Sequence, residues 1–191
     1  MFRLFYFTFM IIEDSEILNK FKDESTKNKA FELLLKKYQQ KLYWHIRRIV
    51  IHHDDADDLV QDVFIKVWKN LHSFRQDSQL YTWLYRIATN ESITFLNKKK
   101  EKYHLSFEDL SESLSKSLND DNYFTGDEIQ KKLQKALLTL PEKQRLVFNM
   151  KYFDDLKFQE ISDILGTSVG ALKASYHLAV KKIESYLLAS D

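Results

Sequence analysis

The sequence of 191 residues contains no cysteine, only three glycines and a single proline, Pro141. Without cysteine the chain has no disulfide, no cysteine nucleophile and no thiolate zinc site, and it suits a reducing compartment such as the cytoplasm. Because glycine and proline are the residues that most often interrupt helices, their scarcity favours long helices. The sequence also lacks a convincing alternation of apolar and polar residues, the pattern that predicts strands. We therefore expect an all-α protein.

A large net charge is also absent, since 29 Lys and Arg against 28 Asp and Glu leave +1. This balance excludes a protein that coats DNA through bulk positive charge. The length suits one or two compact domains. An apolar content of 44%, with 14% aromatic residues, is sufficient for their cores.

Acidic charge is concentrated in one stretch of the chain. Residues 101–130 contain eight acids against two lysines, a local balance of minus six, together with five serines. Such a polar, acidic stretch predicts a flexible linker over residues 105–130. The linker would join two small helical domains, one over residues 25–104 and one over residues 131–188.

The N-terminus carries an apolar run from Leu4 to Ile12 that is interrupted only by Thr8. Nine residues are too few to span a bilayer, and no small-residue cleavage site accompanies them. Met10 offers an alternative start of translation, which would make the preceding residues an extension. We interpret residues 1–24 as an N-terminal tail.

Three long helices are predicted between this tail and the linker. The first covers about residues 27–50, and the third about residues 79–102. The second opens at an acidic cluster over residues 54–58, because carboxylates suit a helix N-terminus through capping and attraction to the helix dipole. Their expected inward stripes are Phe31, Leu35, Tyr38, Leu42 and Ile46; Val60, Val63, Phe64, Val67 and Leu71; and Leu80, Leu84, Ile87, Ala88 and Phe95.

The second helix has an outward face of unusual composition. It carries Asp58, Gln61, Asp62 and Ile65, with Trp68 on its flank. An isoleucine among acids and beside a tryptophan is typical of a surface that binds a partner protein. The alternative is a solvated acidic face with one stray apolar residue.

The third helix has a second stripe beside its apolar one, with residues at steps of three and four. Aromatic rings, an arginine and side-chain amides can hold unstacked bases, and a following lysine run can neutralise phosphates. The alternative for Trp83 is an ordinary core aromatic. The stripe consists of Gln79, Trp83, Arg86, Asn90, Ile93 and Asn97, and the run of Lys98, Lys99 and Lys100.

Residues 158–183 predict a helix-turn-helix. Gly166 permits a sharp exit from a short first helix, and Thr167 or Ser168 can cap the second. The second helix has small residues near its start and cations further along, a composition that suits entry into a DNA major groove. The alternative is an ordinary pair of packed helices. The expected inward face of the second helix is Leu172, Tyr176, Ala179 and Ile183, and its outward face is Gly170, Lys173, Ala174, His177 and Lys181.

Two segments of the chain resemble a known family. DDADDLVQDVFIKVWKNLHSF followed by YTWLYRIATNESITFLNKKK resembles region two of bacterial RNA polymerase sigma factors of the extracytoplasmic-function (ECF) type. LPEKQRLVFNMKYFDDLKFQEISDILGTSVGALKASYHLAVKKI resembles their region four. The two segments occur in the family's order, are separated by the acidic linker and cover about residues 25 to 187.

This resemblance implies a protein that is not an enzyme and that needs neither a cofactor nor a small-molecule substrate. It implies a cytoplasmic factor that binds core RNA polymerase, recognises the minus-thirty-five and minus-ten elements of promoter DNA, and promotes strand opening. It also implies an anti-sigma factor as a further partner.

The resemblance also implies three sets of site residues. The set for docking on core polymerase is Asp58, Gln61, Asp62, Phe64, Ile65 and Trp68. The set for recognising and melting the minus-ten element is Arg75, Gln76, Gln79, Tyr81, Trp83, Arg86, Asn90, Lys98, Lys99 and Lys100. The set for the minus-thirty-five element is Ser168, Gly170, Lys173, Ala174, His177 and Lys181.

The sequence departs from the family pattern at Ser175, Leu178 and Val180, where arginine is commoner. Base contacts by these three residues are therefore not expected. The lysines of the same helix suit phosphate positioning better than base reading.

Two alternative functions come from other classes. His52, His53, Asp54 and Asp55, with His45 nearby, could belong to a helical metal-dependent phosphohydrolase, because His and Asp bind divalent ions. No further His-Asp pair completes a metal cage, so no catalytic or metal-binding residue is assigned. The second alternative is a helix-turn-helix regulator that binds duplex DNA without polymerase.

Overall fold

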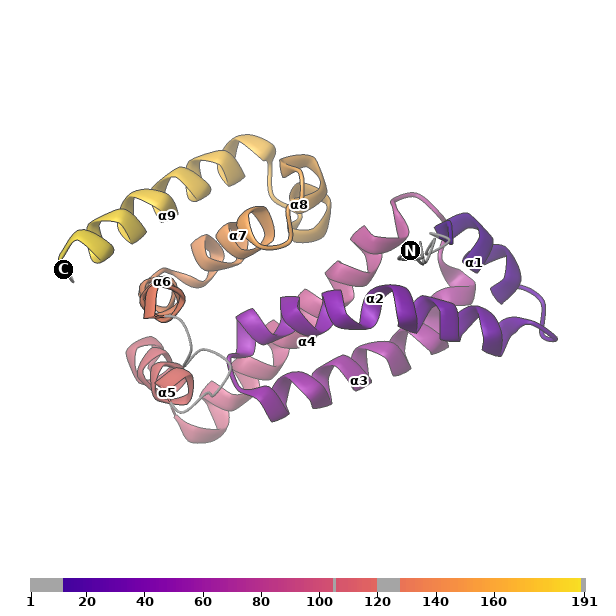
Figure 1. The fold of residues 1–191 in the computed structure, drawn as a ribbon, viewed down its shortest axis with the longest axis horizontal. Coiled ribbons are helices and arrows are strands. Elements are labelled where there is room, and N and C mark those ends of the chain that lie inside the picture. Colours follow the sequence, from indigo (N-terminus) through magenta and orange to yellow (C-terminus); the bar gives the residue numbers. More distant parts are fainter. Residues whose placement is uncertain (1–11, 105, 120–127, 190–191) are drawn as a thin grey trace, which may run out of the picture.

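The computed structural model describes residues 12–104, 106–119 and 128–189, and all their regular structure is helical (Figure 1). The expectation of an all-α protein is confirmed. Among these residues, none of the helices has the length and apolarity that crossing a membrane requires.

The N-terminal domain is built on three helices that lie side by side (Figure 1): α2 (Lys27–Val50), α3 (His53–Asn70) and α4 (Leu80–Tyr103). A short 3-10 helix, η1 (Leu71–Ser73), follows α3. The predicted inward stripe of α3 is buried, since each of its five residues is at most 6% exposed. The first turn of α3 contains Asp54 and Asp55, as the acidic cluster predicted.

A further helix, α1 (Asp14–Phe21), corrects the prediction that residues 1–24 are only a tail. Its Ile17, Leu18 and Phe21 are buried against α2, and Asp14 is 2.7 Å from Lys37 Nζ. The spacing of these three apolar residues carried the signal for the helix. The alternative start at Met10 lies outside the described residues.

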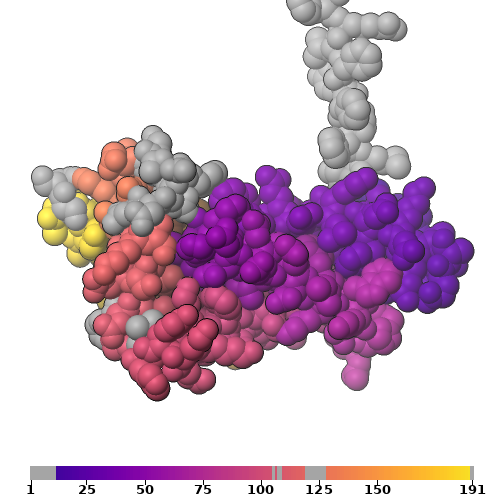
Figure 2. All heavy atoms as spheres, turned by 90° about the horizontal axis from the view of Figure 1, so that it is seen from below, coloured from indigo at the N-terminus to yellow at the C-terminus, as the bar shows by residue number. Residues whose placement is uncertain are grey.

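The expected flexible linker also contains a helix, α5 (Phe107–Asn119). Leu110, Leu114 and Leu118 recur every fourth residue on it and are buried against Ile51 and Leu138. The prediction of flexibility is therefore wrong for this helix, which lies toward one end of the molecule (Figure 2). The helix was not predicted because serines lie between the leucines and give the segment the polar composition of a linker.

The C-terminal domain consists of α6 (Glu128–Leu138), α7 (Glu142–Tyr152), α8 (Phe158–Leu165) and α9 (Val169–Ala189). Gly166 ends α8 with a φ of 63°, the left-handed conformation that glycine adopts without steric cost. The helix-turn-helix is thus confirmed as α8, the turn over residues 166–168, and α9. On α9 the predicted inward residues Leu172, Ala179 and Ile183 are buried.

The two domains pack against each other rather than standing apart (Figure 1). Helix α8 contacts α4, and α7 contacts α2. One buried apolar cluster includes residues of both domains, among them Leu84 of α4 and Ile161 of α8. In the turn between α7 and α8, the side chain of Asp154 is buried against the N-terminal domain, whereas that of Asp155 is exposed.

Candidate functional site

The outward face of α3 has the composition that the sequence predicted. Asp58, Gln61, Asp62 and Ile65 are all exposed, and they follow each other at helical spacing along one side of the helix. Ile65 is 51% exposed, an unusual position for a large apolar side chain. We call these four residues the α3 strip.

Phe64 and Trp68 lie beneath the α3 strip rather than on it. Phe64 is only 6% exposed and packs edge-on against Phe31 at 6.3 Å. Trp68 packs edge-on against Phe31 at 4.9 Å and against Phe21 at 5.4 Å, with Lys27 Nζ 5.3 Å from its ring. These contacts fix the orientation of α3, so both aromatics support the α3 strip from the core side of the helix.

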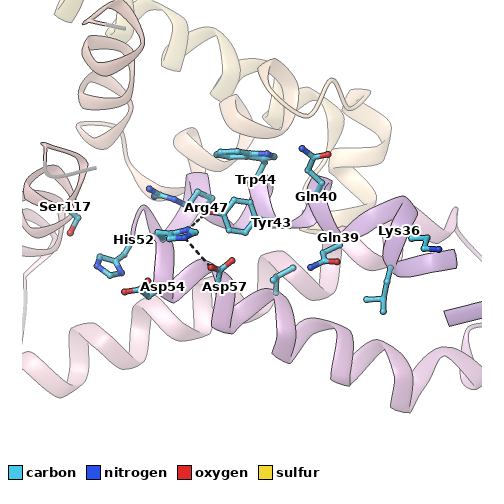
Figure 3. Close-up of a pocket in the computed structure, with 13 residues that line it drawn as sticks. Lys36, Gln39, Gln40, Tyr43, Trp44, Arg47, His52, Asp54, Asp57 and Ser117 are labelled. Atoms are coloured by element: carbon cyan, nitrogen blue, oxygen red, sulfur yellow. Dashed lines mark hydrogen bonds and ion pairs between the residues drawn. The ribbon is translucent and has the colours of Figure 1, made fainter. Parts of the chain in front are cut away.

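A pocket of about 910 Å³ lies between α2 and α3 and was not predicted (Figure 3). His53 lines it, with Nδ1 2.7 Å from the hydroxyl of Tyr43 and Nε2 3.4 Å from Asp57. Arg47 on its wall is buried, and this burial lowers the pKa of its guanidinium. Tyr43 and Trp44 of α2 also line this pocket.

Of the residues suggested for a metal site, His52, His53 and Asp54 line this pocket, but His45 does not join them. His45 is 1% exposed, and its ring nitrogens lie 2.7 Å from Asp154 and 2.9 Å from Thr89 Oγ1, away from His52 and His53. Among the described residues, no three His, Cys, Asp or Glu side chains are placed to hold a metal ion. The phosphohydrolase alternative therefore finds no metal site in the described part of the chain.

The loop before α4 holds three of the predicted minus-ten residues in exposed positions. Arg75 and Gln76 are exposed, and Gln76 adopts a φ of 62°. Gln79 is also exposed and directly precedes α4. The loop thus presents polar side chains to solvent at the start of the helix.

The predicted polar stripe runs along α4, and its members differ in exposure. Arg86 and Asn90 are exposed, whereas Trp83 is half-buried, with its ring 5.3 Å from that of Phe74. Tyr81 is half-buried as well. The pKa of Tyr81 is raised to about 12, chiefly by burial and next by a hydrogen bond to Glu160 of α8.

The lysine run lies at the other end of α4. Lys98 is exposed, and Lys100 is half-buried. Lys99 forms an ion pair with Asp55 at 3.1 Å, which links the end of α4 to the first turn of α3. At least one predicted phosphate-binding lysine therefore also has a structural partner.

The outward face of α9 matches the prediction. Ser168 caps the helix, with its Oγ 3.4 Å from the backbone nitrogen of Ala171. The rest of the predicted face is exposed: Gly170, Lys173, Ala174, His177 and Lys181.

Comparison with known proteins identifies the family of both domains. The Sigma-70 region 2 family matches residues 34–102, and the Sigma-70, region 4 family matches residues 130–183. The ECF RNA polymerase sigma factor SigW of Bacillus subtilis is 33% identical over 156 residues, covering 78% of this chain and 83% of that protein. The ECF RNA polymerase sigma-E factor of Escherichia coli K12 is 32% identical over 165 residues, covering 82% and 86%.

Two solved structures share the fold at 22% sequence identity. One is the sigma factor RpoE in complex with the anti-sigma factor NepR from Bartonella quintana, with a TM-score of 0.66 over 85% of this chain and 99% of that one. The other is CnrH in complex with the cytosolic domain of CnrY, with a TM-score of 0.67 over 93% and 100%.

The match to region 2 decides between the remaining classes, because a stand-alone helix-turn-helix regulator has no need of that domain. The chain belongs to the extracytoplasmic-function sigma factors, non-enzymatic proteins that recognise promoters and initiate transcription with bacterial RNA polymerase.

Proposed function

We propose that three helices of this sigma factor bind three different partners or DNA elements. The α3 strip docks on core RNA polymerase, α4 and the loop before it bind the opened minus-ten element, and α9 binds the minus-thirty-five element. The observation that carries this proposal is the exposed Ile65 between exposed acids on a helix whose other face is core. Apolar anchors ringed by polar groups are what protein interfaces use.

Strand opening on α4 needs no catalytic group. Extruding a base costs a few kcal/mol, which stacking and hydrogen bonds to the displaced base can offset. Trp83 and Tyr81 supply ring faces, and the exposed Arg86 and Asn90 supply donors and acceptors. These groups favour the melted state over the duplex, because unpaired bases alone expose their faces and pairing edges.

On α9 we assign Lys173 and Lys181 to phosphates and His177 to the groove. Ser175 and Val180 are half-buried, so neither is well placed for base contacts. Leu178 is 48% exposed and has no donor or acceptor. The cationic residues therefore position the helix, and Ser168, Gly170 and Ala174 allow its close approach to DNA.

We also propose an anti-sigma factor as a partner and the cytoplasm as the place of action. One structural neighbour was solved with the anti-sigma factor NepR, and the chain has its fold. A partner that covers the α3 strip would compete with core polymerase for it. The absence of cysteine agrees with a reducing compartment.

Permanganate footprinting tests the assignment of α4. Arg86→Ala combined with Asn90→Ala changes two exposed residues, so the fold and the association with core polymerase are expected to stay intact. We expect protection of the minus-thirty-five element to persist while reactive thymines in the minus-ten element are lost. Unchanged thymine reactivity would refute the role of these residues in opening.

A further inference from the structure

Helix α9 carries an exposed apolar stripe beside its cationic residues. Ala171, Ala174 and Leu178 are all exposed, and steps of three and four residues place them on one side of the helix. Leu178 is the largest of the three and is 48% exposed. Helix α9 packs on α6, α7 and α8 through its buried side, so this stripe is directed away from the domain (Figure 1). We call these three residues the α9 stripe.

Cations lie on both flanks of the α9 stripe. Each residue advances about 100° around an α-helix, so Lys181 lies about 60° from Leu178 on one flank and Lys182 about 40° from it on the other. Both lysines are exposed. A helix in the major groove meets a phosphate backbone on either side and base edges between them. When the two lysines contact the two backbones, the α9 stripe faces the bases.

The start of α9 also allows a close approach to the bases. Gly170 is exposed, and a Cβ added to it would meet nothing within 4 Å. Packing within the described part of the chain therefore does not require glycine at this position, where it makes the helix less stable than alanine would. The absent side chain instead leaves room for DNA at the end of α9 where the α9 stripe begins.

The chemistry of the α9 stripe selects one group in the major groove. Leucine and alanine side chains neither donate nor accept hydrogen bonds. Among the groups that distinguish the bases in this groove, only the 5-methyl group of thymine is apolar. A leucine over guanine or cytosine would instead cover polar groups without bonding them, which costs free energy. The α9 stripe therefore favours thymine.

We propose that Leu178, with Ala174 beside it, reads thymine in the minus-thirty-five element through the 5-methyl group. The inference rests on the proposed binding of that element by α9. The sequence predicted no base contact by Leu178, which cannot form a hydrogen bond, but a methyl contact requires none. Leu178 thus adds a preference for one base to a helix whose lysines only position it on the phosphates.

Replacement of thymine by deoxyuridine tests the methyl contact, because uracil keeps the pairing of thymine and lacks only the methyl group. Each thymine in either strand of the minus-thirty-five element is replaced in turn, in a promoter that the sigma–core complex transcribes. Competition against the unmodified promoter measures the affinity of the complex. At one or two positions the wild-type affinity should fall by about four-fold, the effect of burying one methyl group.

Variants of α9 then assign the contact. Leu178→Ala should bind the thymine and uracil promoters equally at those positions, whereas Leu178→Met keeps an apolar side chain of similar volume and should retain the discrimination. The matched control is Leu188→Ala, because Leu188 is on the same helix and is 80% exposed. It should keep the four-fold ratio. Lys181→Ala should lower both affinities and leave their ratio unchanged.

Selection from a promoter pool randomised over the minus-thirty-five element gives an independent readout. The wild-type complex should enrich thymine at the positions where the methyl group matters. Leu178→Ala should lose that enrichment and keep the base preferences at the other positions. The same enrichment of thymine by both chains would contradict the role of Leu178.

Three further results would overturn the inference. The first is a wild-type complex that protects the element but is indifferent to every methyl group in it. The wild-type measurement needs no substitution, so it decides the question even if Leu178→Ala impairs folding. The second is an unchanged ratio in Leu178→Ala. The third is a loss of core binding in Leu178→Ala, which would place Leu178 against the polymerase.

Failure of the proposed function would give a different result. A wild-type complex that leaves the minus-thirty-five element unprotected in a nuclease footprint would count against the binding of DNA by α9, and the inference would fall with it. Protection of the element without any dependence on methyl groups would overturn the reading of thymine alone.

Discussion

At the scale of single residues, the structure separates side chains that contact a partner from those that hold them in place. The sequence placed Phe64 and Trp68 with the docking residues, but they pack against Phe31 below the α3 strip. A helical pattern gives the direction of a side chain but not the neighbours that cover it. Phe31, near the start of α2, packs against both aromatics, and Phe21 of α1, a helix that was not predicted, packs against Trp68.

The α3 strip gives a clear prediction for charge reversal. Asp62→Lys should abolish association with core polymerase in a pull-down, because it places a cation in a surface where acids specify the partner. Asp62 is exposed, so circular dichroism should show an unchanged helical content. Glu32→Lys, a matched reversal at an exposed position of α2, should bind core normally. Equal binding by both variants would refute the role of the strip.

Ile65→Ala tests the apolar part of the same strip. Because Ile65 is 51% exposed, its truncation should change the free energy of unfolding by less than about 0.5 kcal/mol. The affinity for core should nevertheless fall by roughly five-fold or more, which corresponds to an anchor worth about 1 kcal/mol. Denaturant unfolding and a titration with labelled core measure the two quantities. A loss of stability without a loss of affinity would make Ile65 a structural residue.

Tyr81 predicts a dependence of stability on alkaline pH. Its pKa is raised from 10.0 to about 12 in the folded chain, so the folded state retains a proton that the unfolded state loses first. The stabilisation is complete below pH 10 and is lost as the pH rises toward 12. Tyr81→Phe should make the decline in unfolding free energy between pH 10 and pH 12 less steep. Parallel declines in both proteins would contradict the raised pKa of Tyr81 and with it the combined effect of burial and the hydrogen bond to Glu160.

At the scale of helices, the long helices with a regular apolar pattern were predictable, whereas the short helix α1 and the serine-rich helix α5 were not. The α2 bounds of 27–50 agree with the prediction, and the predicted helix at 79–102 is α4 over Leu80–Tyr103. Helix α5 was missed because its leucines are separated by serines and acids. Its partners, Ile51 and Leu138, are distant in sequence, so no local pattern revealed their contact.

Leu114→Ala tests whether α5 is an integral part of the fold. Leu114 is 2% exposed, and leucine truncations of this kind cost about 2–5 kcal/mol in well-packed sites. We expect faster amide hydrogen exchange over residues 107–119 and little change in α2. The exposed control Glu112→Ala should leave the exchange rates unchanged. Wild-type protection in the Leu114 variant would mean that this leucine does not anchor α5.

The recognition helix α9 predicts a dependence on salt. Lys181→Ala should weaken promoter binding by the sigma–core complex equally for all sequences and reduce the slope of log affinity against log salt by about one. Fluorescence anisotropy at several salt concentrations measures both effects. A change in sequence preference with an unchanged slope would mean that Lys181 reads bases.

At the scale of the whole molecule, the domain order was predictable from sequence, but the contact between the domains was not. Each domain carries its own pattern, whereas the contact between them brings together residues from distant elements, such as His45 and Arg48 of α2 with Asp154. None of these residues belongs to a sequence motif, so the sequence alone could not predict that they meet. The closed arrangement places α8 on the surface that the minus-ten element would use.

Transcription from genomic fragments with purified components is the most direct test of this protein as an initiation factor. The chain and the core polymerase of its own bacterium are combined, and each is also assayed alone. We expect transcripts with fixed start sites from a subset of fragments only when both are present. A chain that fails to bind this core, or that binds it and directs no initiation on any fragment, would contradict the assignment.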